Sequence, residues 1–158
     1  MNKLTEARAA AIAQTLDGIN QAVQNYRGNV GRFPQTLSQL STKPATLAPE
    51  LCAGTTPDVN INQWRGPYAS RTFVAAGTQV GDGTVKDTLR RVPANNQSTA
   101  FGVAYVDVIN VDSAVAALLE RSFDGGSTLD TLGTIRWLPD VTSGPVGKVS
   151  FGIPVRGC

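Results

Sequence analysis

Apolar residues recur with a helical period through the first part of the chain. They are spaced alternately four and three residues apart, at Ile12, Leu16, Ile19, Val23 and Tyr26. This spacing puts all five side chains on one face of an α-helix, and the polar residues between them fall on the opposite face. The pattern therefore predicts one long amphipathic helix over residues 3–27, whose apolar stripe packs against a β-sheet.

Glycine and proline predict where this helix ends. Gly28 and Gly31 follow the last position of the stripe, and Phe33-Pro34 comes directly after them. Glycine readily takes the left-handed backbone that terminates helices, and proline forces the residue before it into an extended conformation. The helix is therefore expected to stop sharply after residue 27.

A short helical turn and a long loop are expected next. Thr36 stands before Leu37 and Leu40, so its hydroxyl is placed to cap a single turn. Three prolines then fall between residues 43 and 63. Because proline interrupts regular structure, this stretch is predicted to be a loop.

Short strands make up most of the remaining sequence. They are expected, in chain order, at residues 72–76, 101–105, 134–138 and 149–155. Apolar residues alternate with other residues in the second and fourth of these segments, which is the period of a strand with one buried face. Residues 77–87 are rich in turn formers and are expected to be a turn region.

One more helix is expected within the strand-rich part. Asp112 or Ser113 is placed to cap it, and Asp124-Gly125-Gly126 is placed to end it. A long helix followed by strands, with no βαβ alternation, predicts an α+β fold in which the helix packs on an antiparallel sheet. A single domain over residues 1–158 is expected, made of a helix stem (3–27), a connecting region (28–70) and a sheet-containing head (71–158).

The composition argues against an enzyme. The chain of 158 residues has no histidine, which removes the commonest general base and the usual zinc ligand. None of its lysines stands in the S-x-x-K arrangement of a hydrolase, and no cofactor is expected. The net charge of +2, without a basic stripe, gives no support for nucleic-acid binding. Arg90, Arg91 and Arg136 are expected to be solvated charges.

Five aspartates raise the question of a metal site. Oxygen-rich loops bind calcium, and glycine-rich or threonine-rich segments hold Asp82, Asp87, Asp124, Asp130 and Asp140. The spacing of an EF-hand is missing, however, and aspartate before glycine is typical of turns. We therefore expect no metal site.

Two segments, Tyr26–Pro34 and Trp64–Tyr68, are similar to those of the type IV pilin and type II secretion pseudopilin superfamily. In that family a long helix ends at a tyrosine, and a glycine turn leads to an aromatic-proline pair. A short helix follows, and a Trp-x-Gly-Pro-Tyr segment precedes the sheet. All of these pieces occur here in the same order. The motif residues are Phe33, Pro34, Trp64, Gly66, Pro67 and Tyr68.

The resemblance implies a structural subunit of a bacterial filament, with other pilin or pseudopilin subunits as partners. Family members begin with a short leader and an apolar half-helix, which holds them in the inner membrane before assembly into a periplasmic or extracellular filament. Residues 3–27 resemble the soluble second half of that helix, so an N-terminal truncation is expected. The Asp-Pro-Trp-Gly-like segment before the calcium loop of major pseudopilins is missing. This favours a minor or divergent subunit.

The sequence contains two cysteines, Cys52 and Cys158. A disulfide commonly ties the C-terminal segment of pilins to the body, so the resemblance implies that these two residues are bonded. In the chain-entropy model, closing a loop of that length stabilises the fold by roughly 4–5 kcal/mol. The alternative is a pair of free thiols in a cytosolic protein.

The aromatic pair Trp64 and Tyr68 has two possible roles, packing and ligand binding. Trp64 and Tyr68 are expected to pack the junction of helix and sheet rather than to bind a ligand, because aromatic residues around Gly-Pro usually form a packed corner.

Residues 43–63 and 77–97 are expected to meet neighbouring subunits or outside ligands. The alternative to a filament subunit is a secreted or periplasmic binding module that does not polymerise.

Overall fold

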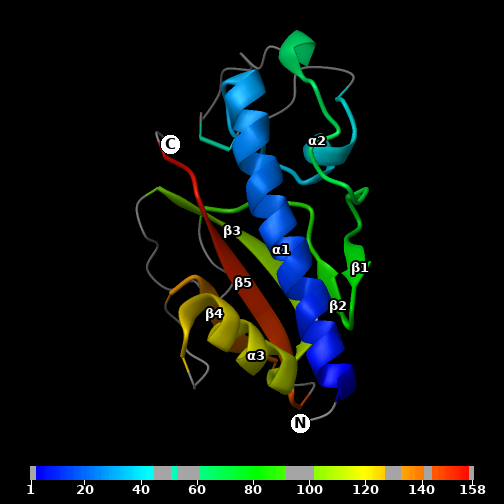
Figure 1. Ribbon diagram of the computed structural model, residues 1–158, viewed down its shortest axis with the longest axis vertical. Helices are drawn as coiled ribbons and strands as arrows, with labels where there is room; N and C mark the ends of the chain where they lie inside the picture. Colours follow the sequence, from blue (N-terminus) through cyan, green and yellow to red (C-terminus); the bar gives the residue numbers. More distant parts are fainter. Residues whose placement is uncertain are drawn as a thin grey trace.

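The computed structural model describes residues 3–44, 51–52, 61–91, 102–126, 133–140 and 144–156 (Figure 1). In chain order its elements are α1 (Lys3–Val30), α2 (Ser38–Ser41), the 3₁₀ turn η1 (Ile61–Gln63), β1 (Thr78–Val80), β2 (Gly83–Val85), β3 (Val103–Asp112), α3 (Ser113–Asp124), β4 (Ile135–Pro139) and β5 (Val146–Pro154). The fold is α+β, with a long N-terminal helix and an antiparallel sheet, as predicted.

The sheet has the strand order β1-β2-β3-β5-β4, and every neighbouring pair is antiparallel. β3 and β5 pair over most of their length, with Val106 opposite Phe151 and Val108 opposite Val149. The register shifts after Val108, where Asn110 has a φ of 60°. Asparagine tolerates this left-handed backbone better than most residues, so the irregularity costs little.

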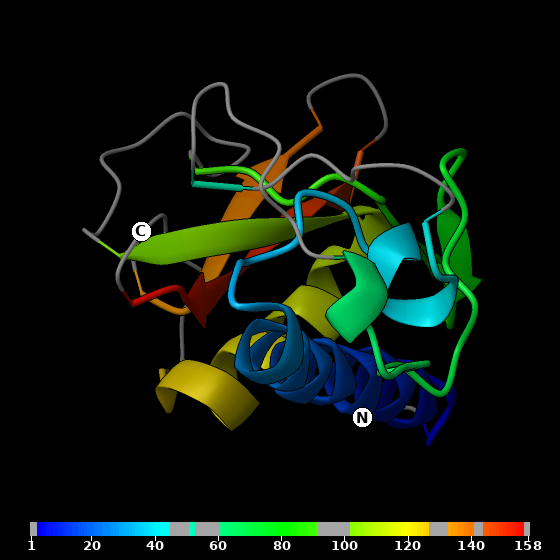
Figure 2. The same cartoon turned by 90° about the horizontal axis from the view of Figure 1, so that it is seen from above.

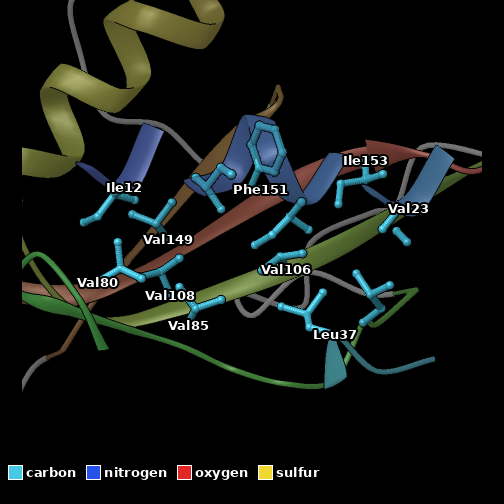
Figure 3. Close-up of a cluster of buried hydrophobic side chains, with 14 of the residues drawn as sticks. Ile12, Val23, Leu37, Val80, Val85, Val106, Val108, Val149, Phe151 and Ile153 are labelled. Carbon is cyan, nitrogen blue, oxygen red and sulfur yellow. The ribbon is translucent and has the colours of Figure 1, made fainter. Parts of the chain in front are cut away.

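Both longer helices cover the same face of the sheet (Figures 1 and 2). α1 contacts β1, β5 and α3, and α3 also packs on β4. All five residues of the predicted stripe on α1 are at most 1% exposed and belong to the hydrophobic core. Figure 3 shows Ile12 and Val23 lying over side chains of β3 and β5, among them Val149 and Ile153. The core therefore lies between the helices and the sheet.

α1 continues to Val30, so the expected end after residue 27 was wrong. Val30 is 4% exposed and stands four residues after Tyr26, which extends the buried stripe by one turn. This burial carries the helix through Gly28. Gly31, with a φ of +85°, ends it instead, and its N–H donates to the carbonyl of Arg27 at 2.9 Å.

The expected threonine cap of the short helix was also wrong. α2 has no side-chain cap from the residue before it, and Thr36 pairs with Thr88 in an isolated β-bridge. The N–H of Ser38 donates to Asp87 Oδ1 at 2.8 Å, and the Ser38 hydroxyl donates to Asp87 Oδ2 at 3.2 Å. A carboxylate far along the chain thus does the work of the local cap.

The strand expected at residues 72–76 is absent, and a hairpin occupies the region expected to be a turn. Phe73 is buried, but Ala75, which would share its face in a strand, is exposed together with Val74 and Ala76, so the segment does not bury alternate residues as a strand would. β1 and β2 form the hairpin, and Gly81, with a φ of +59°, lies in its turn. Val80 and Val85 bury its apolar face.

The inserted helix, β4 and β5 lie where they were predicted, within a few residues. β3 extends to Asp112, well beyond the expected end of its strand, and Phe101 lies outside the described residues. Asp112 caps α3 by accepting the N–H of Ala114 at 2.9 Å, and Gly125, with a φ of +70°, ends it. Of the expected loop, the structure describes only residues 43–44, 51–52 and 61–63.

The face of the sheet away from α1 holds a buried polar cluster. Because Val106 and Val108 face the helix, Tyr105 and Asp107 lie on the opposite face. Asp107 Oδ2 pairs with Arg90 at 2.8 Å, and its Oδ1 accepts the Ser150 hydroxyl at 2.6 Å.

Arg136 belongs to the same face. It is 6% exposed, and its guanidinium lies 5.0 Å from the centre of the Tyr105 ring. The expectation that this arginine is a solvated charge was therefore wrong. Its aromatic contact and its hydrogen bond to the Gly133 carbonyl compensate for the water that burial removes.

Replacing Gly18 by alanine should stabilise the fold by about 0.5–1 kcal/mol, because glycine costs backbone entropy inside a helix. A Cβ at Gly18 meets no atom within 4 Å. Urea unfolding measures the change. Gly147→Ala is the contrasting control. It should destabilise the fold, because a Cβ there would lie 2.5 Å from the Leu138 carbonyl oxygen. A Gly18→Ala variant less stable than the wild type would contradict the described helix surface.

Replacing Asp87 by alanine should destabilise the fold by about 1–2 kcal/mol, because two donors of Ser38 lose their acceptor. Asp87→Asn keeps one acceptor oxygen of similar position and should lose less. Thermal unfolding of both variants makes the comparison. If Asp87→Ala melted at the wild-type temperature, the carboxylate would not be capping α2.

Candidate functional site

Two of the aspartates considered as calcium ligands, Asp87 and Asp124, serve local structure. Asp87 caps α2, and the Asp124 carboxylate accepts the N–H groups of Thr134 and Ile135 at 2.9 and 2.8 Å. Asp130 lies outside the described residues. In the part of the chain that the structure describes, no group of three or more acidic, histidine or cysteine residues is arranged to hold a metal ion.

The two halves of the family motif meet at the C-terminal end of α1. The Tyr26 and Tyr68 rings lie edge to face, with centroids 5.6 Å apart and planes at 69°. Trp64 meets Tyr68 in the same way, at 5.5 Å and 85°. Edge-to-face packing aligns the positive ring edge with the negative face of its neighbour, so it adds specificity to the apolar contact. Residues some forty positions apart thus form one aromatic corner.

Hydrogen bonds hold this corner in place. The Tyr68 hydroxyl accepts the side-chain amide of Asn29 at 3.1 Å and the backbone N–H of Arg65 at 2.8 Å. Trp64 Nε1 donates to the carbonyl of Gln39 at 2.9 Å, and the Tyr68 N–H donates to the carbonyl of Leu40 at 2.7 Å. The corner therefore joins α1 to α2 through the polar ends of its aromatic residues.

The glycine and proline of the motif shape the corner. A Cβ at Gly66 would lie 2.5 Å from the Trp64 ring, so no larger residue fits there without a shift. The Gly66–Pro67 peptide bond is cis. These features match the expected packed corner, and Trp64 and Tyr68 are both partly buried against the core.

The remaining motif residues lie where the chain leaves α1. Phe33 and Pro34 are buried, and the Arg27 guanidinium lies 5.4 Å from the centre of the Phe33 ring. The Phe33 carbonyl accepts the N–H of Leu51 at 3.1 Å. Cys52, the next residue, is disulfide-bonded. Its expected partner Cys158 lies outside the described residues, so the pairing stays a prediction.

Two open grooves flank α1, and the sequence pattern did not indicate either. The helix–loop groove, of about 450 Å³, lies between α1 and residues 68–73; its lining includes Gln14, Gly18, Gln21, Tyr68, Ser70 and Arg71. The helix–sheet groove, of about 580 Å³, lies between α1, the end of α3 and the sheet; its lining includes Asp17, Asn20, Tyr105, Phe123, Asp124 and Phe151. Both volumes are in the range of ligand or side-chain binding sites.

No described helix is both long enough and apolar enough to cross a bilayer. Comparison of the chain with family models, curated proteins and solved structures gives no match. The aromatic corner and the two grooves are therefore the features from which a function can be argued.

Replacing Tyr68 by phenylalanine and by alanine separates the two contributions of its side chain. Tyr68→Phe loses two hydrogen bonds but keeps the ring contacts, and should cost about 1–2 kcal/mol. Tyr68→Ala also loses the contacts with Tyr26 and Trp64, and should cost about 3–4 kcal/mol. Urea unfolding distinguishes the two. Equal losses would mean that the ring packing contributes nothing.

Proposed function

We propose that this chain is the stem and head of a structural subunit of a bacterial type IV pilus or type II secretion pseudopilus. The observation that carries the proposal is the aromatic corner. Its two motif halves, far apart in sequence, meet at the end of a long helix that packs on an antiparallel sheet. The contacts of Tyr68 with Tyr26 and Trp64 support the proposal because they bring together the two segments that carry the resemblance.

The N-terminal end of α1 supports the same proposal. Residues 3–8 are not buried, and the packed part of the helix begins at Ala9. Leu4 is 53% exposed. In the proposed subunit, an apolar half-helix precedes this stem, anchors the protein in the inner membrane before assembly and packs with its neighbours in the filament core. The sheet and the corner then form the head on the filament surface.

The function is polymerisation rather than catalysis. Its partners are other pilin or pseudopilin subunits, and the assembled filament lies in the periplasm or outside the cell. The described polar clusters are consistent with this role, since Asp87, Asp107 and Asp124 each hold local structure through hydrogen bonds or an ion pair.

The sequence encoded upstream of Lys3 in the native gene tests the proposal directly. We expect a short basic leader that ends in glycine, followed by about 20 apolar residues, enough to span a bilayer, with a glutamate near their start. An ordinary cleavable signal sequence directly before this domain would contradict the proposal. The protein would then be better explained as a secreted binding module.

A second measurement asks whether the protein is in a filament. Filaments sheared from the cell surface, or from cells that overproduce the secretion machine, should contain peptides of this chain when analysed by mass spectrometry. Cells that carry a Tyr68→Ala allele should contain less of it in the filament fraction, since the corner that joins stem and head is weakened. Presence only in the soluble periplasmic fraction would contradict the proposed role.

A further inference from the structure

The two grooves beside α1 carry different charges. In Figure 1, residues 68–73 run along one side of α1, and β5 and α3 lie on the other. The helix–loop groove is lined by the exposed cation Arg71. The helix–sheet groove is lined by the carboxylates of Asp17 and Asp124, both of which are exposed. The flanks of one helix thus present opposite charges to neighbours on its two sides.

The helix–sheet groove has the chemistry to receive a basic side chain. Phe123, Phe151 and Pro154 give it apolar walls, beside which lie the carboxylates of Asp17 and Asp124. A long basic side chain combines an apolar stem with a charged end, and so matches walls of this kind.

Arg136 also lines this groove and does not reverse its charge. Arg136 is only 6% exposed, its Nε donates to the Gly133 carbonyl at 3.3 Å, and its guanidinium lies over the Tyr105 ring. This cation is part of the wall. The exposed charges that a visitor would meet are the two carboxylates.

The chain itself supplies a suitable basic side chain. Arg71 is exposed, and it donates a long hydrogen bond, 3.4 Å, to the Gln79 carbonyl. Val74, three residues later, is one of two large apolar side chains exposed among the described residues. The segment from Arg71 to Val74 therefore offers a cation and an apolar contact on the same flank.

We infer that a second copy of this chain inserts its Arg71 into the helix–sheet groove, where the guanidinium meets Asp17 and Asp124. The contact joins unlike surfaces of the two copies, so a pair of copies keeps one free groove and one free Arg71. Unlike contacts that do not close into a ring generate an open helical array. The inference rests on the proposed function and names the side contact between adjacent heads. An exposed ion pair adds little affinity, so its main effect is to fix how the two copies align with each other.

Charge exchange between the two flanks tests the inference. Sedimentation equilibrium measures self-association of the chain over a range of concentrations up to the millimolar. We expect weak association of the wild type, which falls as salt is added. Asp17→Arg and Arg71→Asp should each weaken it by about tenfold, because each places like charges together. An equimolar mixture of the two variants should recover part of the association, since a contact between the two different variants again joins opposite charges at positions 17 and 71.

Matched controls separate this contact from a general effect of charge. Glu6→Arg and Lys86→Asp change exposed residues that line neither groove, and should leave association unchanged. Thermal unfolding of each variant confirms that it is folded. A wild type that stays monomeric at millimolar concentration, equal losses in the controls, or a mixture that fails to recover would overturn the inference.

The results of the charge-exchange experiment can be distinguished from those of the experiments that test the proposed function. If the upstream sequence encodes an apolar half-helix but charge exchange has no effect, the chain is still a filament subunit and its heads meet elsewhere. If charge exchange behaves as expected but an ordinary signal sequence precedes the domain, the self-contact stands and the filament role fails.

Discussion

The burial of one stripe of α1 against β3 and β5 is the interaction on which the rest of the structure depends. β1 and β2 have three residues each, and short strands need a packed face to persist in water. α1 itself carries Gly18 and Gly28 on its exposed side, which lower its intrinsic helicity. Helix and sheet therefore stabilise each other by removing apolar surface from water.

This packing also decides where the functional features lie. Because α1 crosses one face of the sheet, its last turn reaches the loop that carries Trp64 and Tyr68, and the aromatic corner forms there. The helix leaves a groove on each of its flanks, since no other described element fills the space beside it. The corner and the grooves are thus consequences of one helix lying on one sheet, which is also the arrangement that the proposed filament subunit requires.

The opposite face of the sheet is stabilised in a different way. There Asp107 holds Arg90 and Ser150 together, and Arg136 covers Tyr105. A buried polar network of this kind is costly when its partners are missing, so it penalises any shift of β3 against β5. The apolar face of the sheet stabilises the fold, and the polar face fixes the alignment of β3 against β5. This alignment keeps the groove residues of neighbouring strands in position.

The sequence by itself determined the α1 stripe and predicted α3 between a cap at Asp112 or Ser113 and a stop at residues 124–126, because each depends on residues within a few positions of one another. It also supplied the motif residues through the family resemblance. Only the tertiary structure decided that α1 continues to Val30, that Asp87 caps α2 and that residues 78–85 form a hairpin. The same holds for the two grooves. These features depend on contacts between distant segments, and a local pattern of residues carries no information about which distant side chain will satisfy it.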